Sequence, residues 1–559
     1  MEDNVGSPRP NQVKYPWAMI IDVLGIQEFI YASNQLKENV GASHIIAQRL
    51  YGEVLPDILG RVFSIAEDDV QRLQQRLRSG TCLASTQQEF EGFEIGYIGG
   101  GNARIHFARE EDAVRFIQDY SLEVFARFPS IRIAYAMHDA PRDDFASEHQ
   151  QLLQALSQNK HRDLTMTTYP KLGIIEECTH TGQVAEIAYH DEDDGKAIAA
   201  IVQIKRDSAE VATSDLNRKF HDIVQEGYMF TNEANQLGQI RGEHNYMAVV
   251  HIDGNRMGER FRRCRSVDQI RELSTWVQEA NDQAFEETLR DIIHLRAELQ
   301  KQESLQDDPL VCWQQQDQRT ILPIRPILIG GDDITFLAVG KLGIFAARQF
   351  IAHLEDKRIS DQPPLTACAG VCIVKTRYPF FRAYRMAEVL TQRAKMRSRS
   401  HRGVSYLDFV VEPSGFSGDL MELNNEQGIM GGLHAGPYRI GRDPIAPERL
   451  AEDAFQHIEN TVQVLRNWPK NVVYAFRQQL FGDKEQAATF LDLASQHRET
   501  LKGSHFALKR YAVDGESRIW HDSVENRTYT YYYDSITLMD FLVPFCPKGA
   551  DEGSHVPNN

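Results

Sequence analysis

Short apolar runs alternate with longer segments of helical periodicity along most of the chain. Two of these runs, Trp17 to Asp22 and Tyr246 to Asp253, end in an aspartate, as a buried strand with a functional residue at its carboxyl end does. Further apolar runs flank two glycine-rich turns, around Gly99 and around Gly330, and this pattern is typical of β-hairpins. The hydrophobic pattern therefore predicts strands and hairpins joined by helices.

These elements recur at one spacing. Seventy-seven residues separate Asp22 from Gly99, and seventy-seven separate Asp253 from Gly330. The segment YIGGGNARIHF at 97–107 aligns without a gap with LIGGDDITFLA at 328–338. Gly101 and Asn102 take the places of Asp332 and Asp333, and a serine, Ser43 or Ser274, lies 21 residues after each strand acid. The chain therefore carries an internal repeat.

Each copy reads strand, helix, β-hairpin, helix, strand, which is typical of a ferredoxin-like or palm domain. The predicted fold class is α/β (α+β), with two such domains in tandem and a mostly helical C-terminal domain. The predicted organisation is a disordered N-terminus at 1–16, a degenerate first palm at 17–150, an insert at 151–243, a catalytic second palm at 244–412, a helical domain at 413–547 and a disordered tail at 548–559.

Composition excludes several classes of protein. The net charge of −18, from 61 basic and 79 acidic residues, argues against broad nucleic-acid binding. The seven cysteines form no C-x-x-C pair, and Cys178 with His180 fits a structural role better than a metal site, so we expect no zinc site. No apolar run approaches the roughly 20 residues of a membrane helix. We expect a soluble, cytoplasmic protein without membrane contact.

The second copy holds the residues with candidate chemistry. Adjacent carboxylates such as Asp332 and Asp333 repel each other unless a cation lies between them, and Mg²⁺ (or Mn²⁺) is the usual ion. Asp253 precedes a glycine-bearing loop, Gly254-Asn255-Arg-Met-Gly258, whose backbone N–H groups suit a triphosphate. Three carboxylates are enough for two metal ions, which activate a 3′-hydroxyl for in-line attack on an α-phosphate.

A basic run follows a predicted strand of the second copy. Between residues 375 and 402 there are nine Lys or Arg residues and one acid, Glu388. The run could bind a triphosphate, RNA or a partner protein, or it could form a solvated helix face. The sequence leaves these four alternatives open.

These motifs together resemble a known family, the large palm-containing subunit of type III CRISPR effector complexes, which makes cyclic oligoadenylates. The resemblance lies in IDGNRMG at 252–258, GGDDITFLA at 330–338, LTACAGVCIVKTRYPF at 365–380, the Ala394-Lys395 pair with SYLDF at 405–409, and IDVLGIQEFI at 21–30 with GAS at 41–43. It covers both palms well and the insert and C-terminal region loosely.

The resemblance implies two facing palms that hold two ATP molecules, one palm catalytic and one degenerate. It implies that Asp253, Asp332 and Asp333 bind Mg²⁺, beside Gly330 and Gly331. The donor triphosphate is expected to meet the loop from Gly254 to Gly258 and Lys395, and Ser43 and Ser274 are expected to contact adenine. Guide-RNA effector subunits are the implied partners, and target RNA is the implied activator.

The chain departs from the family pattern in three respects. The first palm begins within twenty residues of the N-terminus, and the four His-Asp dipeptides are not placed for an HD nuclease, so we expect no nuclease. Zinc-binding cysteine pairs are absent, and the chain is short. Two alternatives remain: a stand-alone cyclase that makes a cyclic dinucleotide or another conjugate, and a scaffold subunit that binds nucleotide without turnover.

Overall fold

The structure of the chain is a computed structural model. It describes residues 15–79, 90–139, 145–161, 173, 175–191, 195–237, 245–306, 308–358, 363–401, 403–412, 433–441, 453–482, 484–502, 511–513, 516–518, 521–522 and 528–543. Apart from residues 15 and 16, the segments expected to be disordered, 1–16 and 548–559, lie outside this range.

The chain divides into two compact units. The first comprises Met1–Lys219, Arg256–Asp282 and Ile327–Ile334, and the second comprises Phe220–Asn255, Gln283–Pro326 and Thr335–Asn559. The Gly330 to Asp333 turn therefore belongs to the same compact unit as the first palm, although most of the second palm belongs to the other unit.

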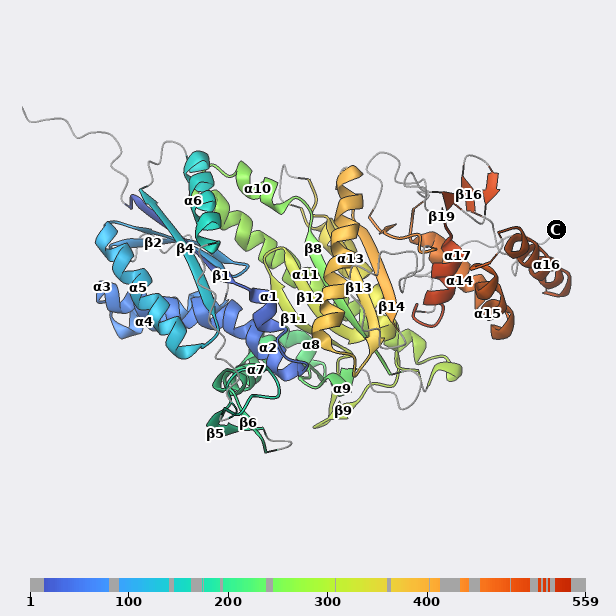
Figure 1. Ribbon diagram of the computed structural model, residues 1–559, viewed down its shortest axis with the longest axis horizontal. Coiled ribbons are helices and arrows are strands. Elements are labelled where there is room, and N and C mark those ends of the chain that lie inside the picture. The colour runs from blue at the N-terminus through green and yellow to red at the C-terminus, as the bar shows by residue number, and fades with distance from the viewer. Residues whose placement is uncertain are drawn as a thin grey trace, which may run out of the picture. The chain divides into compact units, whose positions relative to one another are not determined.

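The first palm is built on a four-stranded sheet in the order β2-β3-β1-β4 (Figure 1). The strands are β1 (Trp17–Leu24), β2 (Phe93–Gly99), β3 (Asn102–Phe107) and β4 (Arg132–Asp139). Strand β1 pairs antiparallel with both β3 and β4. Its central position buries the run from Ala18 to Ile21 on both faces, as the continuous apolar pattern predicts.

Helices cover both faces of this sheet. On one face Ala18 and Ile20 of β1 pack with Leu152 and Leu156 of α6 (Phe145–Lys160). On the other face the ring of Phe107 lies 5.3 Å from that of Phe116 in α5 (Glu110–Arg127). Helix α6 crosses the domain boundary expected at residue 150, because its apolar face completes the core of the first palm.

A helical segment joins β1 to the hairpin of the first palm. It contains α1 (Ile26–Ile30), α2 (Leu36–His44), a π-helical stretch (Ile45–Val54), α3 (Leu55–Phe63) and α4 (Glu67–Ser79). Ser43 lies near the end of α2 and is buried.

The insert contributes the strands β5 (Glu186–His190) and β6 (Ala197–Ile198) and the long helix α7 (Ala200–Lys219). Helix α7 packs against α2 so closely that a Cβ at Gly41 would lie 1.6 Å from the backbone oxygen of Lys205. His180 forms ion pairs through Nδ1 with Glu38 and through Nε2 with Asp191, both at 2.9 Å. His180 thereby links α2 to the segment that follows β5.

The second palm repeats the strand order of the first in a six-stranded sheet, β11-β12-β8-β13-β14-β15. The strands are β8 (Tyr246–Gly254), β11 (Ile324–Gly330), β12 (Asp333–Val339), β13 (Ala367–Lys375), β14 (Tyr406–Glu412) and β15 (Tyr438–Arg439). The helices are α10 (Met257–Arg263), α11 (Val267–Leu299), α12 (Gly343–Asp356) and α13 (Phe380–Ser400), with 3₁₀ turns at Glu303–Leu305 and Gly340–Leu342. The expected order of elements is confirmed in both copies.

Helix α13 covers one face of this sheet, where Ala394 packs with Cys368 of β13 and Tyr406 of β14. Helix α12 lies on the face that carries Ala248, so close that a Cβ at Gly343 would clash with its methyl group. Because side chains alternate along a strand, His251 and Asp253 of β8 face the same side of the sheet. Lys395 of α13 pairs with Asp253, which places that side toward α13.

The remaining elements are short or helical. Strands β7 (Tyr228–Met229), β9 (Gln315–Gln316) and β10 (Arg319–Ile321) form a small sheet near α8 (His221–Gln225) and α9 (Ala234–Leu237). The C-terminal region holds the helices α14 (Gln456–Leu465), α15 (Lys470–Gln479), α16 (Lys484–Lys502) and α17 (Tyr531–Leu538). It also holds two pairs of short strands: β16 (Tyr511–Val513) pairs with β17 (Glu516–Arg518), and β18 (His521–Asp522) pairs with β19 (Thr528–Tyr529). Within the described residues, no helix combines the length and the apolar character needed to cross a membrane.

Candidate active site

The two glycine-rich hairpins are closed by two-residue turns of different conformation. Gly100 and Gly101 close the first hairpin with φ of 58° and 78°, as a type I′ turn requires at both central positions. In the second hairpin only Gly331 has a positive φ, of 60°, and the next position is Asp332. An aspartate fits there because its φ is negative.

The two turns lie against each other within the first unit. A Cβ at Gly331 would lie 3.7 Å from the Cα of Gly100, so only hydrogen atoms separate the two backbones at this point. The acid-bearing turn of one copy is thus packed directly on the acid-free turn of the other.

One face of α11 runs along both turns. Asn281 donates its side-chain amide to the backbone oxygen of Gly331 at 2.6 Å, and Gln278 donates to that of Ile329 at 3.4 Å. Ser274 lies beside the first hairpin, with its Oγ 3.4 Å from where a Cβ of Gly99 would be. These three residues are four and three positions apart, the spacing of a single helix face.

The turn of the first palm is held by strand β1 and by the helical segment that follows it. The Tyr51 hydroxyl donates to the Gly101 oxygen at 2.6 Å, and the Val23 N–H donates to the same atom at 3.1 Å. In the sheet register Asp22 lies opposite Asn102. Asp22 is buried and forms an ion pair with Lys160 of α6. Burial raises the pKa of Asp22, against the opposing effect of Lys160.

The strand acid of the second palm has a similar partner. Asp253 ends β8 opposite Cys368 of β13 and forms an ion pair with Lys395 of α13. The side chains of Asp253 and Lys395 are 15% and 16% exposed. In each palm, therefore, a lysine of the helix that follows the last shared strand neutralises the strand acid. Lys395, which the resemblance predicts at the triphosphate, pairs with Asp253 in the structure.

The loop after Asp253 is partly used for its own support. The backbone N–H of Asn255 donates to the Thr366 oxygen at 2.7 Å, and its side chain donates to the Thr366 hydroxyl at 3.1 Å. The backbone N–H of Asn255 is therefore not available to a phosphate. The sequence predicts that the N–H groups of this loop bind one, and Asn255 departs from that expectation. Gly258 is exposed, with open space where a side chain would be.

Much of the basic run is paired within the fold. Arg385 pairs with Glu388, Arg393 with Asp408 and Arg397 with Asp453, at 3.3 to 3.5 Å. Arg402 lies outside the described residues. These pairs hold three of the nine basic side chains of the run within the fold.

The three acids have the chemistry of a magnesium site but do not form a closed one. No group of three or more His, Cys, Asp or Glu side chains in the described part of the chain converges as a metal ion requires. Mg²⁺ in nucleotide sites takes one or two carboxylates and completes its shell with water and phosphate oxygens. Asp332 and Asp333, adjacent and half-buried, supply such a donor pair.

Sequence reasoning missed Gln278 and Asn281. The sequence did contain a signal for Asn281, because this polar residue stands where the helical pattern calls for an apolar one. In the structure the side chain is 2% exposed. A buried amide needs a hydrogen-bond partner, and here the partner is the turn that carries the acids.

Comparison with known families supplies an independent observation. The family described as Cas10/Cmr2, second palm domain, matches residues 246–402. Residues 246–402 are therefore similar to a Cas10/Cmr2 second palm domain. The matched segment contains Asp253, the Gly330 to Asp333 turn and Lys395. The tandem-palm α/β fold and the resemblance to a Cas10-like palm subunit are thereby confirmed.

The chain is also similar, at low sequence identity, to several solved structures. The Csm1–Csm4 cassette in complex with AMPPNP is 14% identical, with 95% of this chain and 70% of that chain covered and a TM-score of 0.47. The same cassette with one ATP gives a TM-score of 0.48 at 14% identity, with coverage of 94% and 70%. Csm1 of T. onnurineus gives 0.48 at 16% identity, with coverage of 95% and 70%. No curated protein matches the chain.

Proposed function

We propose that the chain is a Mg²⁺-dependent nucleotidyltransferase that joins ATP molecules into a cyclic oligoadenylate signal in type III CRISPR antiviral defence. The observation that carries the proposal is the contact of the two turns. The acid-bearing turn of the Cas10/Cmr2 palm packs on the acid-free turn of the first palm. A site with acids on one side only distinguishes a donor nucleotide from an acceptor.

The register of the first palm supports the grouping of the three acids. Asp22 lies opposite Asn102 across β1 and β3. The two copies are offset by 231 residues, whether counted from Asp22 to Asp253 or from Asn102 to Asp333. By this correspondence Asp253 and Asp333 belong opposite each other on neighbouring strands, with Asp332 at the adjoining turn.

In the proposed reaction the 3′-hydroxyl of the acceptor attacks the donor α-phosphate, a new phosphodiester bond forms, and pyrophosphate leaves. Mg²⁺, held by Asp253, Asp332 and Asp333, would supply charge neutralisation for the phosphates and acidify the 3′-hydroxyl. Lys395 pairs with Asp253 and orients that carboxylate. The loop to Gly258 would receive the triphosphate, and Ser43 and Ser274 would contact adenine. In this proposal the chain works in the cytoplasm, with guide-RNA effector subunits as its partners and a target RNA as its activator.

One observation favours a second candidate, a scaffold that binds nucleotide without turnover. The carboxylate of Asp253 already has a cationic partner in Lys395, so a metal ion is not needed to compensate it. In this case the second palm would bind ATP but release no pyrophosphate.

The experiment separates these functions by product. The purified chain, alone and with its effector subunits and target RNA, is incubated with each nucleoside triphosphate and Mg²⁺ or Mn²⁺, and products are identified by mass spectrometry. We expect a cyclic oligoadenylate and pyrophosphate from ATP. Asp332→Asn/Asp333→Asn should lower the rate by about 10²–10³-fold, because the developing charge loses its counter-ion.

Asp68→Asn/Asp69→Asn is the matched control, since it neutralises two adjacent acids at the exposed start of α4. Its rate should equal that of the wild type. If the product is a cyclic dinucleotide, the proposed product is wrong. ATP binding without pyrophosphate release would show that the chain is a scaffold. Full turnover in the Asp332/Asp333 variant would refute the assignment of these residues as metal ligands.

A further inference from the structure

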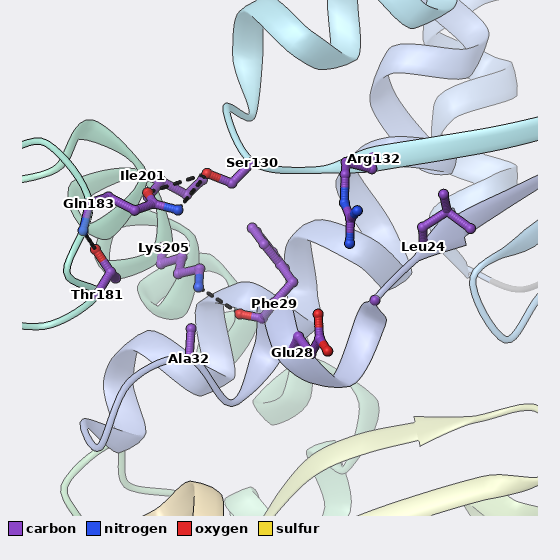
Figure 2. A pocket seen from close by; sticks show the side chains of 11 residues that line it. Leu24, Glu28, Phe29, Ala32, Ser130, Arg132, Thr181, Gln183, Ile201 and Lys205 are labelled. Atoms are coloured by element: carbon purple, nitrogen blue, oxygen red, sulfur yellow. Dashed lines mark hydrogen bonds between the residues drawn. The ribbon is translucent and has the colours of Figure 1, made fainter. Parts of the chain in front are cut away.

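The first unit contains a cavity of about 160 Å³ that none of the candidate active-site residues lines (Figure 2). Its walls come from the end of β1, from α1, from the start of β4, from the insert and from α7. Its volume is close to the roughly 150 Å³ of an engineered cavity that holds benzene. The space is therefore large enough for one ring-sized group.

The cavity is separate from the paired turns. In the first sheet the hairpin β2-β3 lies on one side of β1, and β4 lies on the other. The cavity is on the β4 side, where Leu24 at the end of β1 pairs with Arg132 at the start of β4. A ligand here would leave the two glycine turns uncovered.

A buried ammonium group lines the cavity. Lys205 of α7 is 2% exposed, its Nζ donates to the Phe29 oxygen at 2.6 Å, and Nζ lies 4.1 Å from the centre of the Phe29 ring. An ammonium has three N–H donors, so one hydrogen bond leaves donors for a ligand. None of the ion pairs of the described residues includes Lys205. Glu38 is a nearby negative charge but forms no ion pair with Lys205, so the buried ammonium still favours an anion beside it.

The mouth of the cavity adds a second cation. Nη2 of Arg132 and Oε2 of Glu28 each lie 3.3 Å from where a Cβ of Gly25 would be, so both head groups meet at this glycine. Figure 2 shows the Phe29 side chain between Lys205 and Arg132. Phe29 and Ile201 are buried and apolar. The lining thus combines two cations and one carboxylate with an apolar floor.

The geometry points to a second ligand site in the first unit, for a small anion with a ring-sized apolar body. Its carboxylate or phosphate would accept hydrogen bonds from Lys205 and from Arg132 at the mouth, and its ring would lie against Phe29 and Ile201. Burial lowers the pKa of Lys205 to about 8, against the opposing effect of Glu38, so the ammonium is still mostly charged at neutral pH. This site is independent of the proposed nucleotidyltransferase activity.

Calorimetry on the full chain with four probes tests the proposal. Benzoate and phenyl phosphate carry both a ring and a charge, inorganic phosphate lacks the ring, and benzyl alcohol lacks the charge. We expect one of the first two to bind at millimolar concentration or better and to identify carboxylate or phosphate as the preferred group. The other two should bind at least tenfold more weakly.

Two variants locate the site. Lys205→Met keeps the aliphatic stem and removes the charge, and it should weaken binding at least about tenfold, the usual loss for a charge-assisted hydrogen bond. Lys37→Met is the matched control on α2, where Lys37 pairs with Glu210 at the surface, and it should bind as the wild type does. If Lys205→Met does not fold, Arg132→Gln at the mouth should still weaken binding.

Three results would overturn the proposal. No binding of any probe to the wild type would identify the cavity as a hydrated gap. Equal binding of benzyl alcohol and benzoate would remove the role of charge. Undiminished affinity in both Lys205→Met and Arg132→Gln would place the binding elsewhere.

Discussion

The two palms share a sheet order and a lysine-paired strand acid, but they differ at the turn. The first palm has Gly101 and Asn102 where the second has Asp332 and Asp333. Its strand acid, Asp22, is buried, with a raised pKa, whereas Asp253 is half-buried. The comparison teaches that the fold survives without the acids, so their presence in the second palm is not required for packing.

The turn conformations explain how this difference is tolerated. Gly101 has a positive φ, and a Cβ there would lie 2.3 Å from Ile26, so no acid fits that position of the first palm. Asp332 occupies a negative-φ position of a different turn type. The asymmetry is therefore part of the backbone and is not a matter of two substituted side chains alone.

A bulky residue in the acid-free turn tests whether catalysis needs both palms. Gly100→Asn keeps the left-handed conformation, which Asn tolerates, and adds a side chain, with its Cβ 3.9 Å from Nδ2 of Asn102, to the turn whose backbone packs on Gly331. We expect product formation to fall by about a hundredfold, as small misplacements of a catalytic group cause. The measurement is the rate of pyrophosphate release.

Gly182→Asn is the control for the substitution itself. Gly182 also has a positive φ, of 68°, and open space around it. This variant should keep the wild-type rate. A Gly100→Asn variant as active as Gly182→Asn would show that the first turn takes no part in catalysis.

We next expect the stabilities of the two units to depend on pH in opposite directions. Burial and Arg104 lower the pKa of His149 in the first unit to about 4. Burial alone would lower the pKa of His434 in the second unit, but Asp534 and Asp408, each 2.7 Å away, raise it to about 9. His149 therefore stabilises the first unit above pH 6.5 and loses this effect as pH falls toward 4. His434 stabilises the second unit below pH 6.5 and loses its effect as pH rises through 9.

Hydrogen exchange resolved by segment, at acid and at alkaline pH, measures both units at once. The free energy of unfolding of each unit should change by about 3 kcal/mol. His434→Asn should flatten the alkaline side only, and His149→Asn the acid side only. If each substitution leaves its own side of the pH profile unchanged, the assignments are wrong.

Removing the lysine that pairs with each strand acid should change the rate by smaller factors. Lys395→Met should lower the rate about tenfold, because Asp253 loses the partner that orients it. Lys160→Met removes the matching partner of Asp22 and should leave the rate within about threefold, since the first palm holds no proposed metal ligand. Equal losses in both variants would mean that the two strand acids have equivalent roles.

The repeat, both hairpins and the order of elements could be predicted from the sequence, because strand patterns and fixed spacings are local signals. Helix α7 was missed, since its buried face includes Lys205 and Ser208 beside Ile201 and so looks polar. The pairing of Lys395 with Asp253, 142 residues apart, has no local signal. The support of Gly331 by Asn281 is likewise a contact between distant segments, and only the folded chain reveals it.

The most direct test of the central claim compares the two strand acids in one assay. Asp253→Asn and Asp22→Asn make the same change at corresponding positions, each beside a lysine. With ATP, Mg²⁺ and the activating assembly, we predict that Asp253→Asn releases pyrophosphate at least about a hundredfold more slowly than the wild type, while Asp22→Asn stays within about threefold. Equal rates in the two variants would contradict an asymmetric pair of palms with one catalytic half.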